Sequence, residues 1–297
     1  MANFGDTERY VKNLFVKGKK FTYQGVTYTV LESGKPMPLK GECKTDVYVR
    51  VLDETNNEKE FKISIKKKNA DFLENKIRLE RAIEILGDEA QEIIEKSLRA
   101  IKQVFEDSPL VYFQAHGNTR ALSITMGWRF EFINKLGGKK AGLIQLTDRQ
   151  KMNVYAGTEL SQDKKDCKVN GSLVRDSGVA NYIMVVEDVG NSLEHYLDNM
   201  QSIEDYIKDK EIYFACKALN YRCGEGKWEA NRALAVYVDW TLKNNKLYSK
   251  LVFDKPLSIE GGVIGNHVKE ILSSLKITKD NFADLKLILD KGTKFFG

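Results

Sequence analysis

The chain has 297 residues, of which 42% are hydrophobic and 30% charged, an ordinary composition for a globular protein with a sizeable core. No apolar run approaches the roughly 20 residues of a membrane span, and the N-terminus lacks the apolar stretch of a signal peptide. We therefore expect a cytoplasmic protein with no membrane partner. Four cysteines without a CxxC pair and three scattered histidines argue against structural zinc. The net charge of +5 permits a nucleic-acid partner without demonstrating one.

The first quarter of the chain predicts a short helix followed by strands. Residues 6–17 place their apolar side chains on one helical stripe, and residues 21–32 predict two short strands. Residues 45–53 and 60–68 alternate apolar and polar side chains on either side of a turn composition at 53–58. These two segments form the strongest predicted β-hairpin in the sequence.

The rest of the chain predicts a mixture of helices and strands. Residues 70–86 and 88–107 have helical spacing, and Pro109 follows the second segment. Residues 110–190 predict mainly strands. A helix, a strand pair and a terminal helix are then predicted over 192–211, 232–253 and 263–274. No linker composition marks a boundary, so we predict one α/β domain over 1–297, a mixed β-sheet flanked by helices.

The hairpin brings together residues suited to phosphodiester hydrolysis. A turn centred at residues 55–56 places Asp46 opposite Ile65, and other turn types allow a slip of one residue. Ser64 and Lys66 flank Ile65 and share the face opposite the apolar side chains. Opposed side chains lie about 5 Å apart at Cβ, so a carboxylate and an ammonium can share one substrate phosphate. The carboxylate would hold Mg²⁺, and the lysine would orient the attacking water or stabilise developing charge.

One carboxylate is not enough to hold the metal, and four glutamates compete for the second position. Glu60 forms a literal E-x-K with Lys62, but the register places it over ~15 Å along the strand from Asp46. A glutamate on the helix predicted over 70–86 fits better, because that helix begins beside the strand end. We prefer Glu80; the alternatives on that helix are Glu84 and Glu74.

At these residues the chain resembles the PD-(D/E)xK nuclease superfamily, and within it the type II restriction endonucleases. The matching stretch is residues 44–72, and it is most similar to a variant that carries S-x-K, with the missing acid about fourteen residues beyond the lysine. Ser64, Lys66 and Glu80 match that pattern. The resemblance implies a restriction-endonuclease-like core in which Asp46 and Glu80 bind Mg²⁺. It also implies that Lys66 assists the attacking water and that Ser64 occupies the vacated acid position.

The resemblance also implies a metal-binding glutamate on the N-terminal helix, and Glu8 stands where that residue is expected. The proline that usually precedes the aspartate is replaced here by Thr45. The similarity covers roughly residues 1–105, which we expect to carry the catalytic core elements. Residues 106–297 would then complete the sheet and supply the elements for DNA recognition and dimerisation.

Basic and amide side chains are the candidates for DNA contact, because they donate and accept hydrogen bonds at base edges and phosphates. They gather at the lysine-rich end of the hairpin and in residues 161–181 and 220–232, with residues 116–120 as a further candidate. The residues that we single out are Lys67, Lys68, Asn69, Lys164, Lys165, Asn170, Arg175, Arg222 and Lys227.

These features predict a type II restriction endonuclease that uses Mg²⁺ to hydrolyse phosphodiester bonds in double-stranded DNA. A palindromic target would be matched by a homodimer, since a two-fold site fits a two-fold protein. Two alternatives remain. One is a DNA repair or junction-resolving nuclease on the same core, and the other is a non-catalytic DNA-binding protein.

Overall fold

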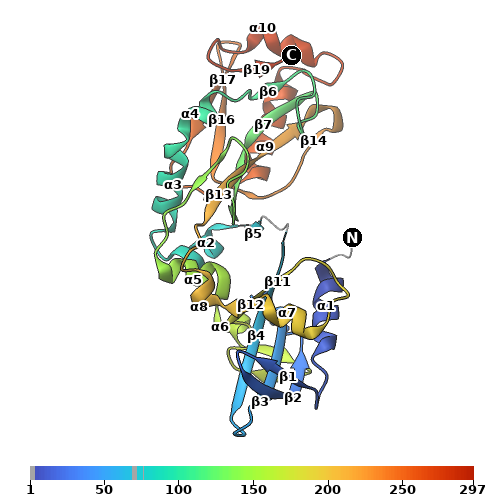
Figure 1. Cartoon of the computed structure of the whole chain (residues 1–297). Helices are drawn as coiled ribbons and strands as arrows, with labels where there is room; N and C mark the ends of the chain where they lie inside the picture. Colours follow the sequence, from blue (N-terminus) through green and yellow to red (C-terminus); the bar gives the residue numbers. More distant parts are fainter. Residues whose placement is uncertain (1–3, 69–71, 76) are drawn as a thin grey trace. The chain divides into compact units, whose positions relative to one another are not determined.

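The computed structural model describes residues 4–68, 72–75 and 77–297 and divides the chain into two compact units. The first unit comprises Met1–Asp71 and Leu146–Glu211, and the second comprises Phe72–Gln145 and Ile212–Gly297. Figure 1 shows the course of the chain through both. Residues 1–105, which the sequence analysis groups as the catalytic core, are therefore divided between the units. The two units are described separately below.

The first unit is built on a mixed β-sheet whose strands run in the order β1-β2-β3-β4-β11-β12. The first four strands form an antiparallel meander, β11 lies parallel to β4, and β12 returns antiparallel to β11. The strand bounds are β1 Lys20–Tyr23, β2 Val26–Gly34, β3 Val47–Leu52, β4 Glu58–Lys67, β11 Tyr182–Val186 and β12 Met200–Ser202. The predicted pairs of strands over 21–32 and 45–68 are confirmed.

The β3–β4 hairpin has a register one residue away from the central prediction. Val47 lies opposite Ile63, and the pairing continues to Leu52 opposite Glu58. The turn is closed by Asp53, whose carboxylate accepts hydrogen bonds from backbone N–H groups within the turn. Because the ladder is shifted by one residue, continuing it past Val47 places Ser64, rather than Ile65, opposite Asp46.

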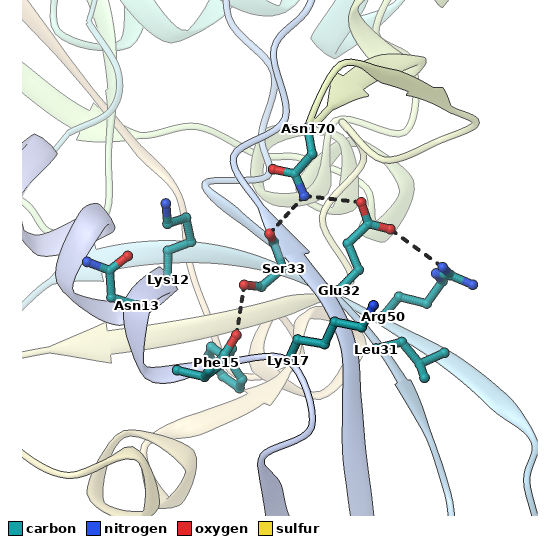
Figure 2. Close-up of a pocket in the computed structure, with 10 residues that line it drawn as sticks. Lys12, Asn13, Phe15, Lys17, Leu31, Glu32, Ser33, Arg50 and Asn170 are labelled. Atoms are coloured by element: carbon teal, nitrogen blue, oxygen red, sulfur yellow. Dashed lines mark hydrogen bonds and ion pairs between the residues drawn. The ribbon is translucent and has the colours of Figure 1, made fainter.

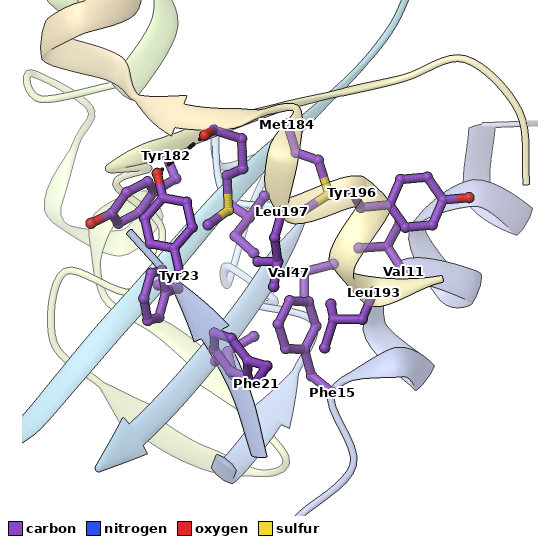
Figure 3. Packing of buried hydrophobic residues seen from close by; sticks show 14 of the residues in the cluster. Val11, Phe15, Phe21, Tyr23, Val47, Tyr182, Met184, Leu193, Tyr196 and Leu197 are labelled. Atoms are coloured by element: carbon purple, nitrogen blue, oxygen red, sulfur yellow. Dashed lines mark hydrogen bonds between the residues drawn. The ribbon is translucent and has the colours of Figure 1, made fainter. Parts of the chain in front are cut away.

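One face of this sheet forms a continuous apolar core (Figure 3). Alternation in β3 and β4 points valine, isoleucine and phenylalanine side chains to the same side, and all of them are fully buried. Helices α1 (Phe4–Leu14) and α7 (Leu193–Asp198) supply further members of this core, among them Val11 and Leu193. Each such side chain contributes about 1.5–3 kcal/mol on burial, so the core fixes which face of the hairpin is left for polar groups.

The remaining elements of the first unit depart from the sequence expectation. The expected strand region 110–190 contains helix α5 (Asp148–Ala156), which begins with a capping box between Thr147 and Gln150. The single helix expected over 192–211 is wrong, because β12 separates α7 from α8 (Ile203–Tyr206). The other short elements of the unit are α6 Gln162–Lys165, β9 Cys167–Val169 and β10 Ser172–Val174.

The second unit is built on another sheet, with the central order β14-β13-β7-β16-β17. Short strands extend it: β5, β6 and β8 pair with β7 or β13, and β19 pairs with β6. The bounds are β5 Phe72–Glu74, β6 Val111–Tyr112, β7 Ser123–Ile133, β8 Ala141–Leu143, β13 Tyr213–Arg222, β14 Lys227–Trp228, β16 Val236–Lys243, β17 Lys246–Val252 and β19 Phe295–Phe296. Strands β15 (Ala233–Leu234) and β18 (Ile259–Glu260) form a separate small ladder.

Helices flank this second sheet. Phe105 of α4 stacks edge-on against Trp128 of β7, and α9 contacts β7, β13, β14 and β16. The helix bounds are α2 Leu79–Leu86, α3 Ala90–Ala100, α4 Lys102–Glu106, α9 Gly261–Ser274 and α10 Leu285–Ile288, with single 3₁₀ turns at Cys223–Glu225 and Phe282–Asp284. The predicted helix over 70–86 is wrong at residues 72–74, which form β5 and pair with β7; the described helix begins at Leu79.

Both units are thus mixed α/β structures with sheets flanked by helices, as the sequence predicts at the level of fold class. None of the helices in the described parts of the chain combines the length and apolar character that crossing a bilayer requires.

Candidate functional site

Asp46 lies immediately before β3, at the point where the hairpin ladder ends. Its backbone N–H donates to the carbonyl of Ile63 over 2.8 Å, and its Oδ2 accepts from the backbone N–H of Ile65 over 2.7 Å. The side chain therefore takes the place of a backbone acceptor that β3 no longer provides. This bond fixes the carboxylate beside β4, between Ser64 and Lys66 along the strand.

Two buried hydroxyl groups lie next to Asp46 in the chain or in the ladder. Thr45 is 2% exposed and Ser64 is 1% exposed, and neither hydroxyl has a hydrogen-bond partner within the described residues. A buried polar atom without a partner costs free energy unless something else satisfies it. These two hydroxyls leave hydrogen-bonding capacity beside Asp46.

A pocket of about 500 Å³ opens at Asp46. Glu8 of α1, Lys35 just after β2, and Asp46 all line it. Glu8 is mostly buried and accepts a hydrogen bond from the Lys35 ammonium. Glu8 and Asp46 therefore line the same pocket, and the role of Glu8 as a metal ligand stays a prediction.

The charges around Asp46 act on its acidity in opposite directions. The pKa of Asp46 is raised to about 6; burial is the largest cause, and the nearby Glu8 carboxylate acts in the same direction. Lys66, the Ile65 hydrogen bond and Lys35 lower it without cancelling the rise. The hydrogen bond from Lys35 to Glu8 raises the pKa of the lysine. Two carboxylates and two ammonium groups thus form one electrostatic cluster in the first unit.

Lys66 is half-buried near the end of β4 and is close enough to influence Asp46. No hydrogen bond or ion pair of its ammonium is found within the described part of the chain. Lys67 ends β4, and Lys68 forms an ion pair with Glu187. Asn69 lies outside the described residues. Of the four, Lys66 is the residue that contributes to the Asp46 cluster.

Glu60 lies far from Asp46 along the hairpin and contacts other residues. It lies opposite Arg50 in the ladder, so it is four residues, or about 13 Å, along β3 from Asp46. Its carboxylate accepts a hydrogen bond from the Tyr48 hydroxyl and lies 3.9 Å from the ammonium of Lys62. The literal E-x-K is therefore a pair on the sheet surface, as the register argument predicts.

The other three glutamates considered as the second acid belong to the second unit, whereas Asp46 and Lys66 belong to the first. Glu80 is exposed in the first turn of α2. Glu74 and Glu84 both accept hydrogen bonds from Arg81. Glu80 and Glu84 lie on α2, but Glu74 lies on β5. The single helix that was expected to carry all three glutamates away from the end of the hairpin is therefore not formed. The assignment of Glu80 stays a prediction.

The donor set at the pocket fits Mg²⁺. The ion takes one or two protein carboxylates and keeps several waters, and Asp46 with Glu8 supplies two carboxylates beside unpartnered hydroxyl groups. Over residues 4–68, 72–75 and 77–297, no group of three or more His, Cys, Asp or Glu side chains is arranged to hold a metal. Any bound Mg²⁺ would therefore depend mainly on water for its remaining ligands.

The other DNA-contact candidates of the first unit lie in or near α6 and the β9–β10 hairpin. Asn170 occupies its turn with a positive φ of 49°, and its amide donates to Glu32 and to the carbonyl of Ser33 (Figure 2). Asn170 thus joins the hairpin to β2, beside a pocket of about 600 Å³ that Lys12 and Lys17 also line. The remaining candidates are Lys164 and Lys165 at the end of α6, and Arg175, which is exposed.

The candidates of the second unit are held by acidic neighbours. Arg222 donates to Glu225 and Glu229, and Lys227 forms an ion pair with Glu225 over 3.2 Å. These pairs fix Arg222 at the end of β13. Lys227 remains exposed at the start of β14.

Sequence reasoning missed Lys35 as a member of the Asp46 cluster. The signal was present in the register of β2 against β3, where Gly34 lies opposite Tyr48. Continuing that ladder brings Lys35 and Pro36 beside Asp46. The expected strand ended at residue 32, so the extension was not considered.

No family model, curated protein or solved structure was found to match this chain in comparisons with each.

Proposed function

We propose that this chain is a Mg²⁺-dependent endonuclease that cleaves double-stranded DNA, of the type II restriction class. The observation that carries the proposal is the cluster at the end of the β3–β4 hairpin, where Lys66 and Glu8 both act on Asp46. Asp46 and Glu8 also line one pocket. A mixed sheet whose meander is continued by a parallel strand supports the same proposal at the level of the fold.

Each residue of the cluster has a distinct role in this proposal. Asp46 and Glu8 hold the metal. Lys66 orients the attacking water or stabilises the charge that develops on the phosphate. Ser64 stands at the vacated acid position. Bound Mg²⁺ would supply charge neutralisation and a more acidic water.

The raised pKa of Asp46 supports a cation ligand at this position. A half-buried carboxylate with a second carboxylate nearby is unfavourable in its ionised form, and burial and Glu8 both act in that direction here. A divalent cation between the two carboxylates would relieve that cost. The two ammonium groups of Lys35 and Lys66 offset only part of this cost, since the pKa of Asp46 stays raised, and a perturbed carboxylate of this kind is typical of functional sites.

The partners in this proposal are duplex DNA and a second copy of the chain. A palindromic target would pair with a homodimer. A second candidate function is a non-catalytic DNA-binding protein, and one observation favours it: among the described residues, no third carboxylate joins Asp46 and Glu8 in a metal-binding group.

Incubating the protein with plasmid DNA and Mg²⁺ tests the proposal. We expect discrete fragments that disappear with a chelator and are absent for Lys66→Ala. The matched control is Lys20→Ala, which removes an exposed lysine from β1. Wild-type cleavage by Lys66→Ala would refute the assigned chemistry, and DNA binding without any cleavage would favour the second candidate.

A further inference from the structure

Two sequence segments that we singled out for DNA contact meet at one pocket of the second unit. Asn118 and Thr119, from residues 116–120, line this pocket of about 580 Å³ together with residues from 220–232. An ion pair of 2.6 Å between Arg120 and Glu225 joins the two segments. The pocket therefore unites loops that are about a hundred residues apart in the sequence.

Two of the basic residues that line this pocket, Arg129 and Lys217, share one buried carboxylate, that of Glu131. Arg129 of β7 and Lys217 of β13 are directly opposed in the ladder. Both reach Glu131, Arg129 over 2.9 Å and Lys217 over 3.0 Å, and Glu131 is only 1% exposed. Like charges at opposed positions repel unless an anion lies between them. One carboxylate for two cations fixes both side chains and leaves positive charge facing the pocket.

The wall of the pocket adds two arginines. Arg222 is oriented by Glu229, the one carboxylate among the residues that line the pocket. Arg232 comes from the loop after β14, and no ion pair or hydrogen bond of its guanidinium is found in the parts of the chain that the structure describes. Asn220 completes the wall and is held by Thr125 and Glu229.

We infer that this pocket contacts the phosphodiester backbone of duplex DNA. Guanidinium groups bind phosphate oxygens through two parallel hydrogen bonds, and such contacts fix the register of a protein on the duplex. Arg232 has no acidic partner among the described residues, and the Lys217 ammonium keeps donors beyond the one that it gives to Glu131. Arg222 and Arg129 are held in place by their acids. This inference rests on the proposed function, because it takes DNA as the substrate.

The test measures DNA binding in the full-length chain without cleavage. A fluorescein-labelled duplex is titrated with the Lys66→Ala protein in a chelator, over a range of salt concentrations, and compared with Lys66→Ala that also carries Arg232→Ala and Lys217→Ala. Log affinity falls with log salt, and each lost phosphate contact lowers the magnitude of that slope by about 0.9, so we expect the magnitude to decrease by about two. The control carries Lys243→Ala and Lys246→Ala, which remove the same charge at the β16–β17 turn.

An unchanged slope in the Arg232/Lys217 variant, or an equal decrease in the control, overturns the inference. Thermal unfolding checks that the variant is folded; if it is not, Arg232→Ala alone is expected to lower the magnitude of the slope by about one. Inorganic phosphate is titrated separately. Phosphate binding at the pocket with no change in the DNA slope shows a small-anion site and also overturns the inference. A lowered slope in a protein that never cleaves DNA supports this inference while the proposed nuclease function fails.

Discussion

The carboxylate of Asp46 accepts a 2.7 Å hydrogen bond from the backbone N–H of Ile65. One side chain therefore completes the β3–β4 ladder and also faces the pocket that Glu8 lines. Asp46 thus has a structural role in the ladder and, in the proposed function, a second role as a metal ligand. The substitution chosen at Asp46 decides which of these two roles an experiment measures.

Asp46→Asn separates the two roles better than Asp46→Ala. Asparagine keeps an oxygen that can accept from Ile65, so we expect stability within about 1 kcal/mol of wild type and cleavage reduced at least about a hundredfold. Alanine leaves a buried N–H without its partner and costs about 1–3 kcal/mol more. Urea unfolding and plasmid cleavage of both variants check this. Full activity in Asp46→Asn would exclude the carboxylate as a metal ligand.

Glu8→Gln tests the helix contribution to the site. If Glu8 binds the metal, the Mg²⁺ concentration for half-maximal cleavage rises about tenfold or more. Lys35 competes for the Glu8 carboxylate through its hydrogen bond, so Lys35→Met is expected to lower that concentration. If the Lys35→Met variant loses cleavage even at saturating Mg²⁺, Lys35 takes part in the cleavage step and does not merely compete with the metal for Glu8.

The stability of the metal-free protein should depend on pH through Asp46. Its pKa is raised to about 6 in the folded chain, mainly by burial. Between the ordinary aspartate pKa and about 6, the folded state holds more protons than the unfolded state. The free energy of unfolding therefore falls as the pH rises through that window. Denaturant unfolding with a chelator at several pH values measures this fall. Asp46→Asn should lack it, and an identical fall in both proteins would contradict the prediction.

Glu60→Ala and Glu80→Ala distinguish the two motif assignments. Glu60 lies opposite Arg50 and accepts from Tyr48, so its removal should leave most cleavage activity. Glu80→Ala should abolish cleavage if that residue completes the metal site. If Glu60→Ala loses cleavage and Glu80→Ala keeps it, the second metal-binding acid is Glu60 of the E-x-K motif.

Local patterns predicted the hairpin well because its strands, turn and buried face all follow from short-range alternation. The register differed by one residue, since Asp53 closes the turn through its own side chain and the ladder begins at Leu52 opposite Glu58. The polar face with Asp46, Ser64 and Lys66 followed from the same alternation.

Elements that depend on distant partners could not be predicted in this way. Residues 72–74 have helical spacing, yet they pair as β5 with β7. Likewise β12 interrupts an expected helix because Met200 pairs with Met184. Lys35 joined the cluster through strand pairing that reaches beyond the predicted strand end. In each case a tertiary contact overrides the local preference.

The parallel pairing of β11 with β4 has a consequence for synthesis of the chain. Until Tyr182–Val186 has left the ribosome, the strand that carries Ser64 and Lys66 has no neighbour on its outer edge. Open edges of this kind recruit other chains, and distant pairings close slowly. A nascent chain that stalls within the segment Phe72–Gln145 would therefore expose β4 to aggregation, so folding of the first unit requires translation to continue well past β4 itself.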